Sequence, residues 1–241
     1  MDELSRGVVL HLIKYSDSAF IAHVFTEREG CQPFLVGISH ARRAAVRYTL
    51  FQPLALLELG WTRRPGAEMC RPTQARVAVP FTSLPFDPYK SAIAMFLAEF
   101  LRYALRGEPA SAHLFEYVFR SVEWLDAAER DFANFHLVFL LRLTRFLGFF
   151  PDVGGARPDC YFDLQSCQFT PVRPVHGQFL EPADAARLPV LLRMRYENMR
   201  LFRFSGQERN RILGAINDFY RLHVPGFPEL KSLSVLRDLF H

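Results

Sequence analysis

Apolar and β-branched residues recur at short intervals over the first 80 residues, and turn-forming residues separate them. Glu27–Gly30 and Arg63–Gly66 are clear turn signals, because each ends in glycine after polar residues. The pattern predicts five short strands, over Gly7–Ile13, Ala19–Thr26, Gln32–Ile38, Thr49–Trp61 and Arg71–Val79. Five strands in so few residues are typical of a small β-barrel of the OB type. An SH3-like barrel gives a similar pattern, so periodicity alone leaves both open.

Helical spacing replaces this pattern after Pro80. Ser83–Pro88 holds two prolines and an aspartate, which predicts a linker into a helix. Apolar residues at three-to-four-residue spacing then predict helices over Tyr89–Arg106, Ser111–Ala127, Asp131–Phe149, Pro182–Met194, Ser205–Val224 and Lys231–Phe240. Ser205 and Glu208 have the spacing of a capping box. Between the third and fourth helices, Pro151–Glu181 is rich in proline and glycine and predicts an irregular segment.

These elements predict an α+β protein of two domains. A small OB-fold barrel occupies residues 1–80, and an all-α domain occupies residues 81–241, with the irregular insertion at 151–181. The chain has 241 residues, half of them apolar, which is enough to bury one large core or two modest ones.

Composition adds an expected location. The N-terminal sequence MDELSRG places two acids before its first base, unlike a signal peptide, and no apolar run approaches the length of a membrane span. The four cysteines are scattered rather than densely spaced, which is not typical of a secreted disulfide scaffold. We therefore expect a cytoplasmic protein with reduced thiols.

Positive charge is concentrated in one part of the predicted barrel. The whole chain carries a formal net charge of only +4. Between Val36 and Pro80, however, seven arginines stand against Glu58 and Glu68, a net charge of +5. The distribution of charge, more than its total, is what indicates a polyanionic partner.

A candidate nucleic-acid site lies within this basic segment. Its members are arginines and aromatic residues that follow the third and fourth predicted strands: Arg42, Arg43, Arg47, Tyr48, Trp61, Arg63 and Arg64. A groove for single strands needs cations along the phosphates and aromatic faces for the bases. The alternative is a solvated basic loop beside ordinary core aromatics, and for each aromatic taken singly, core packing is the better hypothesis.

The sequence predicts no catalytic residues, no metal site and no cofactor. It lacks a phosphate-binding loop, a dinucleotide-binding glycine motif, an HExxH motif and a nucleophile elbow. His11, His23 and His136 lie in strand-like or buried helical segments, where packed or hydrogen-bonded histidines are expected. Cys160 and Cys167 lack the close pairing of a zinc ribbon.

Another feature of the helical region could recognise a partner protein. Basic residues lie at the ends of strongly apolar predicted helices, namely Arg142, Arg145, Arg193 and Arg195. A hydrophobic cleft rimmed by arginine suits an acidic, apolar peptide tail. The alternative is an ordinary core with a solvated surface, which the sequence cannot distinguish from a cleft.

The order of short motifs along the chain resembles that of the RecO family. The motifs are Gly7–Val9, Tyr15–Ser18, Val24–Glu27 with Gly30, Ala41–Arg43, Leu50–Leu54, Phe135–Leu137, Leu143–Phe149 and the C-terminal segment His223–Phe240 with Leu230–Leu233. No single motif is diagnostic, but together the motifs span nearly the whole chain, and their order is specific.

The resemblance implies a function. It implies an N-terminal OB-fold, a helical C-terminal domain and no enzymatic site, in a protein associated with the nucleoid. It further implies binding of single- and double-stranded DNA, annealing of complementary strands, and loading of RecA. The implied protein partners are RecR and the acidic C-terminal tail of single-strand-binding protein. Arg42 and Arg43 fall on the basic barrel loop that the resemblance associates with DNA contact, and Arg47 is assigned less firmly.

Two departures from the family pattern bear on these expectations. Many relatives have a four-cysteine zinc site where this chain keeps only Cys160 and Cys167, which favours a zinc-free variant. Ser39 and His40 stand where many relatives have a Lys-Gly pair, so the basic loop loses one charge. Two other function classes stay open: an adaptor that binds only a partner's tail, and an enzyme with a site assembled from scattered residues.

Overall fold

The structure, a computed structural model, describes residues 4–38, 45–63 and 66–239. Two compact units make up the chain, the first Met1–Ala127 with Glu229–Leu239 and the second Ala128–Pro228. Each unit is described by itself. The domain boundary expected near residue 80 stays a prediction.

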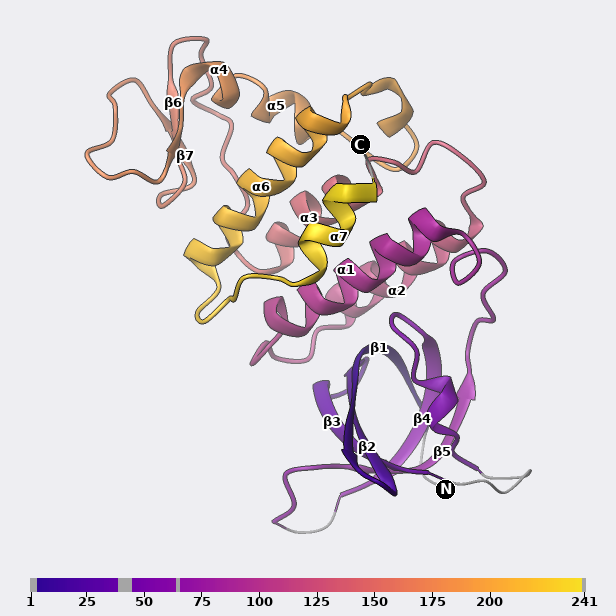
Figure 1. The fold of residues 1–241 in the computed structure, drawn as a ribbon. Coiled ribbons are helices and arrows are strands. Elements are labelled where there is room, and N and C mark those ends of the chain that lie inside the picture. The colour runs from indigo at the N-terminus through magenta and orange to yellow at the C-terminus, as the bar shows by residue number, and fades with distance from the viewer. Residues whose placement is uncertain (1–3, 39–44, 64–65, 240–241) are drawn as a thin grey trace. The chain divides into compact units, whose positions relative to one another are not determined.

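The first unit contains a five-stranded antiparallel sheet in the order β3-β2-β1-β4-β5 (Figure 1). Its strands are β1 (Ser5–Ser16), β2 (Ala19–Thr26), β3 (Gly30–Gly37), β4 (Leu56–Thr62) and β5 (Arg71–Val77). The two edge strands approach through one parallel bridge between Phe34 and Cys70, where the Leu35 N–H donates to the Cys70 carbonyl at 2.9 Å. Among the residues that the structure describes, the sheet is not otherwise closed. This arrangement confirms the OB-fold-like class.

Alternation of side chains explains the interior of this sheet. Residues two apart point to the same face of a strand, so alternate residues such as Leu57 and Leu59 enter the interior of the sheet. The fully buried cluster consists of Val9, Ala22, Val24, Phe34, Val36, Phe51, Leu57, Leu59 and Cys70. Gly7 allows β1 and β2 to approach closely, because a Cβ there would lie 2.7 Å from Cγ1 of Val24. Gly30 takes the left-handed conformation that its turn requires, with φ of 68°.

The strand predicted over Thr49–Trp61 is wrong in its first half. A 3-10 turn covers Tyr48–Leu50, and β4 begins only at Leu56. Pro53 has no N–H for a ladder, and Leu54 adopts a left-handed φ of 58°, so extended pairing cannot start earlier. Leu54 nevertheless packs in the core and donates its N–H to the Val9 carbonyl at 2.8 Å.

The helices of the first unit are α1 (Pro88–Ala104), α2 (Ala112–Ala127) and α7 (Ser232–Leu239), and α7 lies along α1 (Figure 1). Asp87 caps α1 by accepting hydrogen bonds from the Tyr89 and Lys90 N–H groups. The Glu99 carboxylate of α1 accepts the Ser232 N–H at 2.8 Å and so caps α7. No helix in the described part of the chain is long and apolar enough to cross a bilayer.

The second unit is mostly helical. Its elements are α3 (Phe135–Phe146), β6 (Tyr161–Asp163), β7 (Gln168–Thr170), β8 (Phe179–Leu180), α4 (Pro182–Ala185), α5 (Leu188–Leu191), a 3-10 turn (Met199–Leu201) and α6 (Gly206–His223). The capping box of Ser205 and Glu208 is confirmed at the start of α6. The buried Tyr220 hydroxyl of α6 donates to the Leu140 carbonyl of α3 at 2.8 Å.

Three predictions for this unit need correction. The segment Pro151–Glu181 is not wholly irregular, because β6, β7 and β8 form a small sheet whose strands are too short to give a periodic signal. The helix predicted over Pro182–Met194 is two short helices, since Pro189 can start α5 but cannot continue a helix from α4. The third predicted helix begins at Phe135 rather than at Asp131, whose φ is 63°.

The segment before α1 is bound to the end of α2. The Asp126 carboxylate accepts hydrogen bonds from the backbone N–H groups of Thr82, Ser83 and Leu84, at distances down to 2.7 Å. Its own carbonyl accepts from the buried Lys90 ammonium at 2.9 Å. Burial alone raises the pKa of this carboxyl, but the backbone hydrogen bonds outweigh burial and hold the pKa below its ordinary value. The segment is therefore fixed rather than free.

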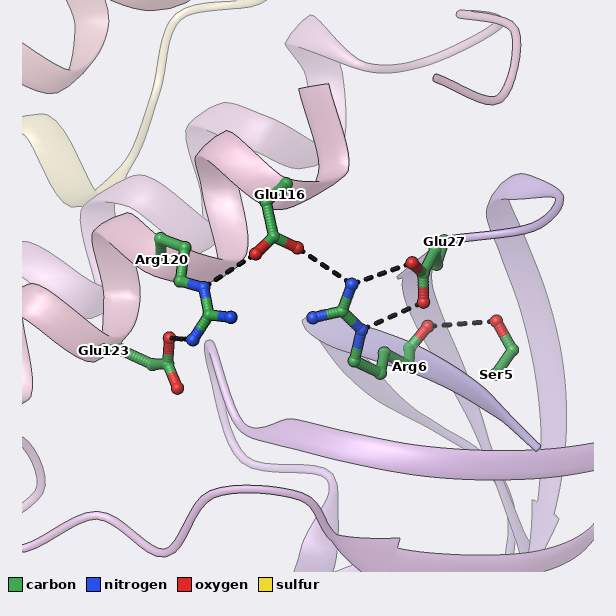
Figure 2. A network of polar contacts seen from close by, with 6 residues as sticks. All are labelled: Ser5, Arg6, Glu27, Glu116, Arg120 and Glu123. Atoms are coloured by element: carbon green, nitrogen blue, oxygen red, sulfur yellow. Dashed lines mark hydrogen bonds and ion pairs between the residues drawn. The ribbon is translucent and has the colours of Figure 1, made fainter. Parts of the chain in front are cut away.

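An ion network joins β1, the β2–β3 turn and α2. Figure 2 shows Arg6 between two carboxylates, bound through both Nε and Nη2 to Glu27 and through Nη2 to Glu116 at 2.8 Å. The Arg6 guanidinium also lies over the rings of Phe115 and Phe119, 5.3 and 5.0 Å from their centroids. The hydrogen bond from Arg6 holds the pKa of Glu27 below its ordinary value.

Replacing Arg6 by methionine should lower the free energy of unfolding by about 1.5 kcal/mol, because two carboxylates would face each other without their shared cation. Urea unfolding would measure the change, and 1 M salt should shrink it. Arg120→Met is the control, since Arg120 is an exposed neighbour in the same network and its loss should matter little. Equal effects of the two variants would contradict this role of Arg6.

Candidate functional site

Only part of the predicted barrel site lies in the described residues. Arg42, Arg43 and Arg64 lie outside them. Arg47 is exposed and extended, directly before the 3-10 turn that begins at Tyr48. The arrangement of the seven predicted residues as one surface therefore stays a prediction.

The two predicted aromatic residues pack partly against the barrel core. Tyr48 stacks on Phe20, with ring centroids 5.0 Å apart and planes 9° apart. Trp61 meets Phe34 edge to face at 5.4 Å. Both rings are partly exposed, so each combines core packing with one accessible side. A base could stack only on that accessible side.

Arg63 is already engaged within the barrel. Its guanidinium binds Glu29 at 3.0 Å and donates to Gln32 and to the buried Cys70 sulfur. A phosphate would have to compete with the Glu29 carboxylate for this cation. The Arg63 guanidinium is thus held by contacts within the barrel.

The second unit brings together the four arginines predicted to rim a cleft. Arg142 and Arg145, one turn apart on α3, line the same groove of about 350 Å³ as Arg193 and Arg195, which follow α5. The remaining lining is apolar and consists of Leu141, Phe150, Val153, Pro189, Leu191, Leu192 and Met194. We call this the arginine groove. These four side chains therefore line one cavity.

The arginine groove carries positive charge that no carboxylate neutralises in the described part of the chain. None of its four arginines forms an ion pair with a carboxylate in the described part of the chain, although Arg145 lies 4.1 Å from the Phe150 ring centroid. No aspartate or glutamate lines it. Four like charges in a partly apolar groove repel one another, so an anion there is stabilised by all four.

A second, more apolar pocket lies beside the groove and shares Leu141 and Leu191 with it. Its two rim arginines are already paired, Arg187 with Glu208 at 3.8 Å and Arg211 with Asp184 at 3.9 Å. Of these two cavities, it is therefore the arginine groove whose arginines lack carboxylate partners among the described residues.

Sequence reasoning missed the excess of basic residues in the segment between α5 and α6. Residues 192–205, between α5 and α6, also carry Arg200 and Arg203 and contain Glu197 as their one acid. Counting charges over these 14 residues alone would have revealed the excess of arginine, as the count over Val36–Pro80 did for the barrel. Counted over the whole second half of the chain, the excess disappears.

The late cysteines lie at opposite ends of one hairpin. Tyr161 pairs with Thr170 and Asp163 with Gln168, so Cys160 precedes the open end and Cys167 lies at the turn. The Cys167 sulfur lies 3.5 Å from Nε2 of His223. No group of three or more metal-ligating side chains gathers in the residues that the structure describes. The absence of a metal stays a prediction.

The three histidines singled out in the sequence are packed to different extents. His11 and His23 are paired across β1 and β2, and burial, followed by the positive charge of Arg102, lowers both pKa values. His136 on α3 is completely buried, which together with Arg209 lowers its pKa to about 3. All three are neutral at pH 7 on this basis.

His136 should make the protein less stable in acid. Below its ordinary pKa of about 6.5 the unfolded chain binds a proton that the folded chain excludes until about pH 3. Stability should therefore fall as pH drops through this window, by up to about 1.4 kcal/mol per pH unit from this one group. His136→Phe should flatten unfolding curves between pH 6.5 and 4.5. The exposed His113→Gln serves as control, and an equal flattening by it would contradict the assignment.

Comparison with known families covers both units. The family described as "Recombination protein O N terminal" matches residues 1–81, and "Recombination protein O C terminal" matches residues 85–234. The matched ranges together leave only a short segment before α1 and the end of α7 uncovered.

Several curated proteins are similar over their full lengths. The DNA repair protein RecO of Phocaeicola vulgatus is 49% identical over 234 residues, 97% of each chain. That of Bacteroides fragilis is 48% identical over 235 residues, again 97% of each chain. That of Porphyromonas gingivalis is 35% identical over 241 residues, 98% of each chain. With both family halves matched in order and full-length relatives at this identity, the chain belongs to the RecO family, which acts in DNA repair and recombination.

Proposed function

We propose that this protein binds single- and double-stranded DNA, anneals complementary strands and, with RecR, helps load RecA onto DNA coated by single-strand-binding protein. Membership of the RecO family supports this role. The observation that carries the DNA-binding part is the +5 segment of the barrel. The proposed place of action is the cytoplasm, at the nucleoid.

The proposed annealing mechanism is electrostatic. Two single strands repel each other, and a basic surface that neutralises phosphates on both lowers this repulsion and raises their local concentration. Base pairing then supplies the driving force, so no covalent step is required. We accordingly propose a mediator without catalytic activity, and incubation of DNA with the protein and magnesium should leave the DNA uncleaved.

Fluorescence anisotropy of a labelled single-stranded oligonucleotide across a salt series tests the DNA role. We expect binding at low salt that weakens steeply as salt rises, with little sequence preference. Replacing Arg42 and Arg43 by alanine should lower the slope of log affinity against log salt by about 1.4, since each phosphate contact contributes about 0.7.

Arg76→Ala is the matched control, because Arg76 lies in the same barrel but is already paired with Glu58. Its slope should stay close to that of the unchanged protein. No binding even at low salt would overturn the DNA role of the barrel, and an unchanged slope in the Arg42 and Arg43 variant would overturn the site.

We propose the arginine groove as the site for the acidic tail of single-strand-binding protein. Its four arginines, which have no carboxylate partner among the residues that the structure describes, match the acidic part of such a tail, and its apolar lining matches an apolar part. Bases prefer aromatic faces, and Phe150 is the one aromatic residue in the lining, so the groove suits a peptide better than a nucleic acid.

An adaptor with no direct DNA role is the alternative. It would bind the tail peptide but not the oligonucleotide, so paired titrations with both separate the two functions. The mediator proposed here should bind both.

A further inference from the structure

Residues 192–205, which we call the connector, join α5 to α6 and contain only one short 3-10 turn. The connector presents Arg193 and Arg195 to the arginine groove. A segment without regular structure must satisfy its backbone polar groups with side chains or water. The side chains that do so determine where its arginines lie.

One amide binds the backbone of both groove arginines. The Asn198 Oδ1 accepts the Arg195 N–H at 2.7 Å, and its Nδ2 donates to the Arg193 carbonyl at 3.2 Å. The Arg195 carbonyl in turn accepts the Met199 N–H at 2.9 Å. These three hydrogen bonds close a compact loop that contains both Arg193 and Arg195.

The following part of the connector is attached to α3 and α6. Nδ2 of the buried Asn134 donates to the Met199 and Phe202 carbonyls, at 3.3 and 2.7 Å. Its Oδ1 accepts from Nε of Arg209, whose Nη2 donates to the Phe204 carbonyl at 3.2 Å.

An aromatic contact adds to this attachment. The ring of Tyr196, between the two groove arginines and Asn198 in sequence, stacks on Phe135 with centroids 4.9 Å apart. The loop closed by Asn198 is therefore attached to the helix that carries Arg142 and Arg145.

We propose that Asn198 is a positioning residue for the acidic peptide, which it need not touch. It holds the backbone of Arg193 and Arg195 in the geometry in which their side chains face the two arginines of α3. Binding then orders fewer groups than it would on a loose loop, and preorganisation of this kind raises affinity. This role rests on the proposed binding of an acidic tail in the groove.

The test is a double-mutant cycle on the full-length chain with a labelled acidic tail peptide. Asn198→Ala should weaken binding about tenfold, mainly through faster dissociation, because the charges that steer association are retained. In a background where Arg193 and Arg195 are already alanine, the same change should have almost no further effect. Gln207→Ala, an exposed amide at the start of α6, is the control and should bind normally.

A second measurement keeps the outcome clear. Hydrogen exchange of the Arg195 amide should speed up in Asn198→Ala whether or not peptide is present, while far-ultraviolet circular dichroism stays unchanged. An equal loss of affinity with and without Arg193 and Arg195 would overturn the positioning role alone. If the unmodified protein bound no acidic peptide, the proposed tail site would be wrong, and the positioning role of Asn198 would be wrong with it.

Discussion

Replacing Asp126 by alanine is expected to lower the free energy of unfolding by about 4 kcal/mol. The change removes the acceptor for three backbone N–H groups, those of Thr82, Ser83 and Leu84, and for the Thr82 hydroxyl. Each donor left unpaired in this partly buried site loses a charge-assisted hydrogen bond, and the cost is greatest for the buried Leu84 N–H. Chemical denaturation of the full chain would measure the loss.

The control for this prediction is Asp126→Asn, which keeps one carbonyl oxygen and nearly the same volume. It should cost about half as much, because the oxygen still accepts but the charge that strengthens each bond is gone. The dependence of stability on pH in acid gives a further check. The folded pKa of Asp126 is depressed, so its contribution is present near neutral pH and should disappear as pH falls below about 4. A loss below 1 kcal/mol in Asp126→Ala would contradict the assigned role.

Removing one arginine from each wall of the arginine groove is expected to weaken binding of an acidic tail peptide about 100-fold. Arg142→Ala with Arg193→Ala deletes two cations that have no carboxylate partner in the described chain, at about 1.5 kcal/mol each. Titration calorimetry or anisotropy would measure the change. The affinity of the unchanged protein should fall as salt rises.

The neighbouring pocket supplies the matched control. Arg187→Ala with Arg211→Ala removes the same formal charge from the same unit, but both side chains are already paired with carboxylates. The control should bind the peptide within a few-fold of the unchanged protein, since the net charge contributes only through long-range attraction. If both double variants weakened binding equally, the groove would not be the site.

Local signals in the sequence were sufficient for most elements of the barrel. Strand β2 has the predicted bounds, because alternation and flanking turns define Ala19–Thr26 without help from distant residues. The helix cap at Ser205 could likewise be predicted from neighbouring residues alone, because its partner Glu208 is three positions away. The predicted start of β4 was wrong because the left-handed Leu54 is completely buried and bonded to the Val9 carbonyl, contacts that no window of sequence reveals.

The candidate sites were less accessible from sequence. Arg142 and Arg193 are 51 positions apart, and only tertiary packing places them in one groove. Asp126 lies near the C-terminal end of α2, where an acid is locally unfavourable, and its partners are 42 to 44 residues away. Such contacts have no periodic signature, so the sequence indicated a linker where the structure has a fixed segment.

The placement of α7 bears on how the chain folds as it is synthesised. Helix α7 belongs to the first unit although the whole second unit precedes it in sequence, and Glu99 of α1 caps its first turn. A ribosome releases α1 long before Ser232, so the face of α1 that α7 covers stays without its partner until α7 has been synthesised. A nascent chain stalled before residue 229 should therefore expose apolar surface and recruit chaperones, even though its barrel strands are complete. Emergence of α7, rather than completion of the barrel, would mark the point at which the first unit becomes fully native.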